Sequence, residues 1–135
     1  MKDRVLIDTS AWIVSFRKSG NEKLKQQVVA ALNSLSAVTT NIITMELLQG
    51  CRDDMEYKKM RSRLEALELM PLNEDVWEMG YSAGYSLRKK GITVPSVDII
   101  IASLAKAHDC TLLHHDRHFK LIARHLDIKT VDFLS

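Results

Sequence analysis

The sequence predicts an α/β protein with three layers, in which a mostly parallel sheet of about five strands lies between helices. Short runs of branched apolar residues recur along the chain, and segments with helical periodicity separate them. Strands that alternate with helices pair in parallel, because each helix carries the chain back across the sheet. The 135 residues are the size of one domain, so residues 1–135 are expected to form a single α/β/α unit.

The first half of the chain begins with a buried-type strand and continues through alternating elements. Strands are predicted at residues 5–7, 37–39 and 69–70. Helices are predicted at residues 11–16, 22–32, 42–51 and 55–67. Asn41 is suited to cap the third helix, because its side-chain oxygen can accept a backbone N–H of the first turn. Pro71 ends the third strand.

The second half repeats this alternation. Helices are predicted at residues 74–89, 97–108 and 117–126, and strands at residues 111–113 and 128–131. Gly91 ends the first of these helices, and Ser96, after Pro95, is suited to cap the second. No linker, repeat or low-complexity stretch interrupts the order, which again predicts one domain.

Composition excludes several classes of protein. An apolar fraction of 46% and a charged fraction of 27% are ordinary for a globular chain, and a net charge of +2 does not by itself indicate a nucleic-acid or membrane partner. No apolar run approaches the roughly 20 residues of a membrane span, and no signal peptide is visible, so a cytoplasmic protein is expected. Cys51 and Cys110 have no paired spacing and are predicted to be small core residues.

Single acids in the most apolar stretches are the most informative feature. Asp8 is the only charged residue between Arg4 and Arg17, Glu46 the only one between Lys25 and Arg52, and Asp98 the only one between Lys90 and Lys106. An ionised acid buried alone is very costly, so such groups are paired, neutralised or bound to metal. Helix capping is the simpler role for Asp8 and Asp98, but Glu46 lies in mid-helix, where capping does not apply.

Asp116 repeats the position of Asp8, because each acid follows a predicted strand and precedes a helix. The carboxyl ends of parallel strands are where sites form in such sheets. Two carboxylates about 5 Å apart repel by about 3 kcal/mol at an effective dielectric of about 20. A divalent cation relieves that repulsion, and an all-carboxylate site suits Mg²⁺ or Mn²⁺.

Four segments together resemble a known family. They are residues 5–10 (VLIDTS), 44–50 (TMELLQG), 97–102 (VDIIIA) and 113–119 (LHHDRHF). Their order and spacing are similar to those of the PIN-domain ribonucleases, and most closely to the VapC-type toxins. Each segment is short, but the ordered set spans nearly the whole chain.

The resemblance implies a five-stranded parallel sheet and a metal-dependent endoribonuclease that uses Mg²⁺ or Mn²⁺. It places Asp8, Glu46, Asp98 and Asp116 in the catalytic metal site and gives Ser10 a supporting role beside the first acid. It also implies an RNA substrate, a cognate antitoxin whose tail covers the active site, and a homodimer. The apolar patterns around residues 12–16 and 55–67 are candidate contact surfaces for such partners, although the core is the simpler use for most of those side chains.

Two positions depart from the family pattern. His118 stands where members often carry a further acid, and His114 where they often carry Thr, which leaves a second metal position open. Three histidines in five residues also raise the alternative of a zinc site made by His114, His115 and His118, although no HExxH pattern accompanies them. Thr9 is predicted to be part of the turn rather than of the site.

The same residues allow two other functions. A phosphatase with Asp8 as nucleophile is disfavoured because Ser10 stands where a second Asp is usual, and a non-catalytic interaction module with a degenerate site is the remaining alternative. Candidate phosphate contacts are the basic residues near motif edges, although residues 88–90 equally suit a solvated helix end. These residues are Arg17, Lys18, Arg52, Arg88, Lys89, Lys90 and Arg117.

Overall fold

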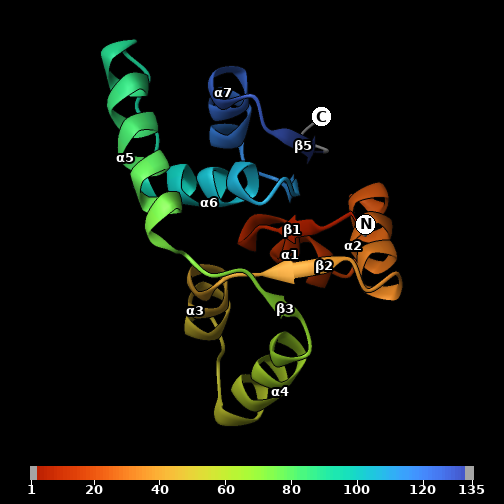
Figure 1. Ribbon diagram of the computed structural model, residues 1–135. Coiled ribbons are helices and arrows are strands. Elements are labelled where there is room, and N and C mark those ends of the chain that lie inside the picture. Colours follow the sequence, from red (N-terminus) through yellow and green to blue (C-terminus); the bar gives the residue numbers. More distant parts are fainter. Residues whose placement is uncertain (1–2, 133–135) are drawn as a thin grey trace.

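A parallel sheet forms the centre of the computed structural model, which describes residues 3–132. Its five strands lie in the order β3-β2-β1-β4-β5, and every neighbouring pair is parallel (Figure 1). The strands are β1 (Val5–Ile7), β2 (Ala37–Thr39), β3 (Glu68–Leu69), β4 (Thr111–His114) and β5 (Lys129–Asp132). The predicted α/β/α fold with about five parallel strands is confirmed.

The helices lie on both sides of this sheet. They are α1 (Thr9–Phe16), α2 (Glu22–Asn33), α3 (Asn41–Gln49), α4 (Asp54–Glu65), α5 (Glu74–Lys89), α6 (Ser96–Ala107) and α7 (Arg117–Leu126). The chain moves outward from β1 through β2 to β3 and then returns to β4 and β5 on the other side of β1. Right-handed connections therefore place α1 to α4 on one face and α5 to α7 on the opposite face.

The chain adds β2 and β3 on one side of β1, and β4 and β5 on the other side. The candidate site lies at the switch point between β1 and β4. Ile7 pairs with Leu113, and the backbone N–H of Asp8 donates to the carbonyl of Leu113 at 2.9 Å. Asp8 and the loop after β4 therefore lie side by side at the carboxyl edge of the sheet. Open α/β sheets bind ligands in the crevice at this kind of position.

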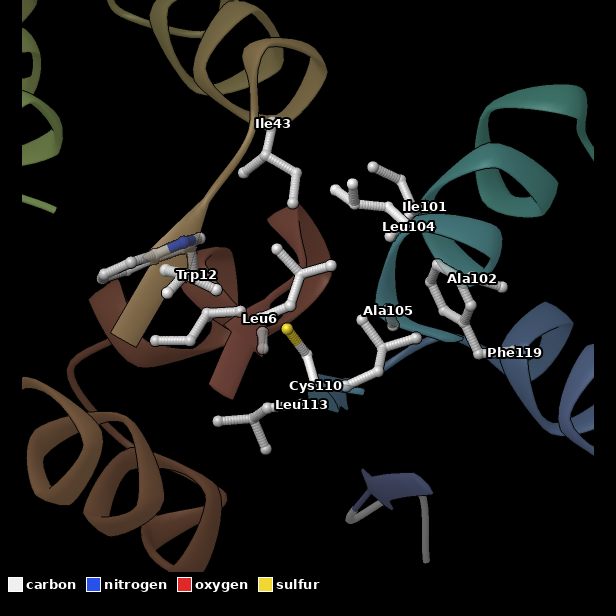
Figure 2. Packing of buried hydrophobic residues seen from close by; sticks show 14 of the residues in the cluster. Leu6, Trp12, Ile43, Ile101, Ala102, Leu104, Ala105, Cys110, Leu113 and Phe119 are labelled. Atoms are coloured by element: carbon white, nitrogen blue, oxygen red, sulfur yellow. The ribbon is translucent and has the colours of Figure 1, made fainter. Parts of the chain in front are cut away.

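The strands form the middle of a continuous apolar core (Figure 2). Leu6 on β1, Leu104 on α6 and Phe119 on α7 have no exposed surface, so helices from the second half of the chain seal the sheet against water. Cys110 is buried in this core as predicted, but the prediction for Cys51 is wrong. Cys51 follows α3 and is only half-buried, with its thiol directed to the carbonyl of Leu47.

Two predicted caps prove to be the first residues of their helices. Asn41 begins α3, and the extended Thr40 precedes it, with its hydroxyl bonded to the carbonyl of Met70. Ser96 begins α6 after Pro95, whose ring fixes φ near the helical value. Each helix thus starts one residue earlier than its sequence pattern predicted. Within residues 3–132, none of the helices has the length and apolar character that crossing a membrane requires.

Candidate active site

Asp8 caps α1 and lies at the carboxyl edge of the sheet. Its Oδ2 accepts hydrogen bonds from the backbone N–H of Ser10 at 2.9 Å and from the Ser10 hydroxyl at 2.6 Å. Only 5% of Asp8 is exposed. Burial raises the pKa of Asp8, the Ser10 hydrogen bonds oppose the rise by stabilising the charged form, and the charges of Glu46 and Asp116 add to it.

Ser10 also connects Asp8 to the neighbouring strand. Its hydroxyl oxygen accepts the backbone N–H of His115 at 2.9 Å, just after β4 ends. One side chain therefore sets the position of the first acid and of the loop that carries Asp116. A supporting role for Ser10, which the resemblance implies, would act through these contacts.

Asp116 caps α7 in the way that Asp8 caps α1. Its Oδ1 accepts the backbone N–H of His118 at 2.9 Å. The backbone N–H of Asp116 donates to Nδ1 of His114 at 3.2 Å, and the buried His114 ring packs against Phe119 with centroids 5.1 Å apart. The buried imidazole thus holds the loop in which the acid stands.

Asp98 lies in the first turn of α6 and meets Asp116 and His118 from α7. Nδ1 of His118 lies 3.0 Å from Oδ1 of Asp116 and 3.2 Å from Oδ2 of Asp98. Each of the three residues offers one ligand atom, and these atoms lie within 4.8 Å of one another. Within residues 3–132, they form the one group of three or more His, Cys, Asp or Glu side chains that converges so closely.

Glu46 reaches the same neighbourhood from α3 on the other side of β1. The hydroxyl of Thr9 donates to Oε1 of Glu46 at 2.7 Å, which fixes this half-buried carboxylate beside the start of α1. Thr9, which the sequence assigned to the turn rather than to the site, thus contacts one of the candidate site acids. Its position directly after Asp8 was the available signal, but the sequence does not reveal that Glu46 lies opposite.

The carboxylates interact strongly enough to change one another's protonation. Burial and the neighbouring charges of Asp116 and Asp8 raise the pKa of Asp98 to about 7, with Glu46 adding to the rise and His118 opposing it. The side chain of Asp98 is 14% exposed and that of Asp116 is 29% exposed, so the cluster opens to solvent on the side of α7. A cation in this position would stabilise the ionised carboxylates.

Comparison with known proteins decides the family. Residues 5–125 match the sequence profile of the PIN domain. The chain belongs to the PIN domain family. It is 29% identical over 133 residues to Ribonuclease VapC11 of Mycobacterium tuberculosis and to a VapC ribonuclease of Mycobacterium bovis, with 96% of this chain and 98% of each relative covered.

Solved structures share the fold of this PIN domain. VapBC2 from Rickettsia felis, bound to a promoter DNA fragment, superposes with a TM-score of 0.74 at 18% identity, covering 96% of this chain and 98% of that one. FitAcB from Neisseria gonorrhoeae gives a TM-score of 0.71 at 22% identity, covering 93% and 95% of the two chains.

The histidines of this PIN domain do not form the zinc site considered from the sequence. The strand end turns at residues 114–116, so His118 joins Asp98 and Asp116 while the buried Nδ1 of His114 accepts a backbone N–H instead. A nitrogen that accepts a hydrogen bond in this way is not available to a metal. The mixed set of carboxylates and one imidazole suits a divalent cation.

Proposed function

We propose that this protein is a metal-dependent endoribonuclease and the toxin of a toxin–antitoxin pair. The convergence of Asp98 and Asp116 beside Asp8, at the switch point of a PIN domain, is the observation that carries the proposal. The full-length relatives named as VapC ribonucleases support the reaction class. We expect the protein to act in the cytoplasm, because its RNA substrate is found there.

We assign the cation to Asp98, Asp116 and Asp8, with Glu46 as a further acid of the site. Mg²⁺ or Mn²⁺ held there would neutralise a phosphate and lower the pKa of a water molecule. Ser10 keeps Asp8 oriented and Thr9 keeps Glu46 oriented, so the carboxylates are positioned before substrate arrives.

A phosphodiester needs positive side chains around this acidic centre. Arg117 is exposed and follows Asp116 directly, so it is the best placed of the candidate phosphate contacts. Arg52 pairs with Glu56 at 3.2 Å, and Lys89 lies over the ring of Tyr85. Arg52 and Lys89 already have partners within the chain, so Arg117 ranks above them.

The proposed antitoxin partner is supported by the fold similarity to VapBC-5 from Mycobacterium tuberculosis, a member of the VapBC family of toxin–antitoxin systems. The two apolar patterns considered from the sequence meet in one groove of about 520 Å³ between α1, α2 and α4. Its lining includes Trp12 and Phe16 from α1, Met60 and Leu64 from α4, and Leu67. An apolar segment of the antitoxin would fit this groove. The homodimer stays a prediction of the resemblance.

Cleavage of a mixed RNA pool by purified protein, with Mg²⁺ or Mn²⁺ and with EDTA, tests the activity. Asp98→Asn and Asp8→Asn are expected to lower cleavage by more than about 100-fold, because each removes a ligand charge while its amide keeps the shape of the side chain. Both variants are expected to stay folded by circular dichroism, since Asn also caps helices.

Asp109→Asn is the matched control. Asp109 is exposed at the opposite end of the sheet, and its left-handed backbone conformation is one that Asn tolerates. This variant is expected to cleave like the parent. If the folded parent cleaves nothing with any metal, the nuclease proposal fails and a non-catalytic module replaces it. If the parent cleaves and Asp98→Asn cleaves equally well, the nuclease stands but Asp98 is removed from its site.

A further inference from the structure

His118 occupies the centre of the acidic cluster although the proposed function does not use it. Its Nδ1 lies 3.0 Å from Asp116 and 3.2 Å from Asp98, and the two carboxylates approach it from different helices. The side chain of His118 is 44% exposed. Its Nδ1, however, has almost no exposed surface and no hydrogen-bond partner among residues 3–132, so an ion bound by the two carboxylates would also give this buried nitrogen a partner.

The spacing of these atoms matches neighbouring ligands of one ion. An octahedral ion with bonds of roughly 2.1 Å places adjacent ligand atoms about 3.0 Å apart. The two distances from Nδ1 of His118 agree with that spacing, and all three ligand atoms lie within 4.8 Å of one another. Two carboxylate oxygens and one imidazole nitrogen can thus occupy one face of the coordination sphere.

The backbone of α7 fixes the ring in this position. Asp116 caps the helix, and its Oδ1 accepts the N–H of His118. The same oxygen lies 3.0 Å from the ring nitrogen, so the cap brings the side chain back over the carboxylate. A ligand held by such a turn loses little conformational freedom when an ion binds.

We propose that Nδ1 of His118 is a ligand of the same ion as Asp98 and Asp116, and that it makes the site prefer Mn²⁺ to Mg²⁺. The inference rests on the metal site of the proposed function and adds a ligand and a selectivity to it. Imidazole nitrogen binds first-row transition metals well, whereas Mg²⁺ strongly favours oxygen ligands. A mixed nitrogen and oxygen set therefore raises the affinity for Mn²⁺ relative to the affinity for Mg²⁺.

Electron paramagnetic resonance of Mn²⁺ tests this ligand directly. A Mn²⁺ titration gives the affinity, competition by Mg²⁺ gives the selectivity, and electron spin echo modulation detects a coordinated ¹⁴N nucleus. The parent is expected to show ¹⁴N modulation. His118→Ala is expected to lose it and to bind Mn²⁺ at least about tenfold more weakly, with the affinity for Mg²⁺ changing less than about threefold.

Two further variants control the experiment. His115→Ala removes a nearby imidazole but keeps the backbone N–H that bonds to Ser10, so its ¹⁴N modulation is expected to match the parent. His118→Asp restores an all-oxygen set, and it is expected to lose the nitrogen signal while binding Mg²⁺ more tightly than the parent does. Thermal melts establish that each variant is folded.

The outcomes separate this inference from the proposed function. Unchanged modulation in His118→Ala would overturn the ligand assignment. Tighter Mn²⁺ binding in that variant would also overturn it, because the ring would then be a cation that competes with Mn²⁺ for the carboxylates. RNA cleavage by a parent protein without ¹⁴N modulation would leave the nuclease intact and remove His118 from the ion. Modulation without any cleavage would keep the ligand and remove the nuclease.

Discussion

At the amino end of the sheet, charged side chains face partners of opposite sign in solvent. Arg4 and Glu68 form a pair of hydrogen bonds at 3.0 and 3.1 Å, with their side chains 43% and 53% exposed. Lys129 and Asp109 pair at 3.0 Å and are more exposed still. Water screens such pairs, so each contributes little to stability.

The carboxyl end of the same sheet has the opposite arrangement. Asp8, Asp98 and Asp116 lie together there, and burial and like charge raise the pKa of Asp98 to about 7. Neighbouring acids that destabilise one another do not strengthen a fold by themselves. The difference between the two ends indicates that the carboxyl end is organised for a cation, and three measurements sharpen or break that comparison.

Ser10→Ala has the largest expected effect. The variant loses the hydroxyl that donates to Asp8 and leaves the N–H of His115 without its acceptor. We expect RNA cleavage to fall by about tenfold or more, and the free energy of unfolding to fall by about 1–2 kcal/mol. Ser15→Ala, which removes a hydroxyl bonded only to the Trp12 carbonyl of the same helix, is the matched control. Equal cleavage by both variants would remove Ser10 from the site.

The pH dependence of stability has an intermediate effect. The folded, metal-free protein keeps a proton on Asp98 between pH 4 and about 7, where the unfolded chain has released it. Since the folded state then binds more protons, the free energy of unfolding falls as pH rises through this range. We expect the melting temperature to drop by several degrees between pH 5 and pH 8, in thermal scans with EDTA.

A saturating divalent cation is expected to restore that stability, and to do so more at pH 8 than at pH 5, because binding requires ionised carboxylates. Asp98→Asn serves as the control, since it removes the titrating group and should flatten the pH dependence. A metal-free melting temperature that rises with pH equally in the parent and in Asp98→Asn would contradict the raised pKa.

Glu68→Gln has the smallest expected effect. It removes the charge of an exposed pair at the amino end of the sheet, so the free energy of unfolding should change within about 0.5 kcal/mol. Cleavage should equal that of the parent, because Arg4 and Glu68 lie at the end of the sheet opposite the acids. A loss comparable to that of Ser10→Ala would mean that the two ends do not differ as described.

The order of strands and helices was predictable because it depends on local pattern. The boundaries of β2, α5 and α7 agree with the prediction, since runs of branched residues and helical periodicity are properties of neighbouring residues. The third strand lies one residue earlier than expected, at Glu68–Leu69, because its register is set by pairing with Val38 and Thr39. Pairing partners far along the chain are not visible in a local pattern.

The sequence by itself determined where lone acids stand, because a charge in an apolar stretch is recognisable without a structure. Only the tertiary structure decided which side chains meet. The tertiary packing, in which α6 and α7 contact each other on either side of β4 in the chain, places His118 rather than His114 beside Asp98. It likewise sets Thr9 against Glu46, across 37 residues of chain. Such contacts follow from the packing of whole elements, which no short motif encodes.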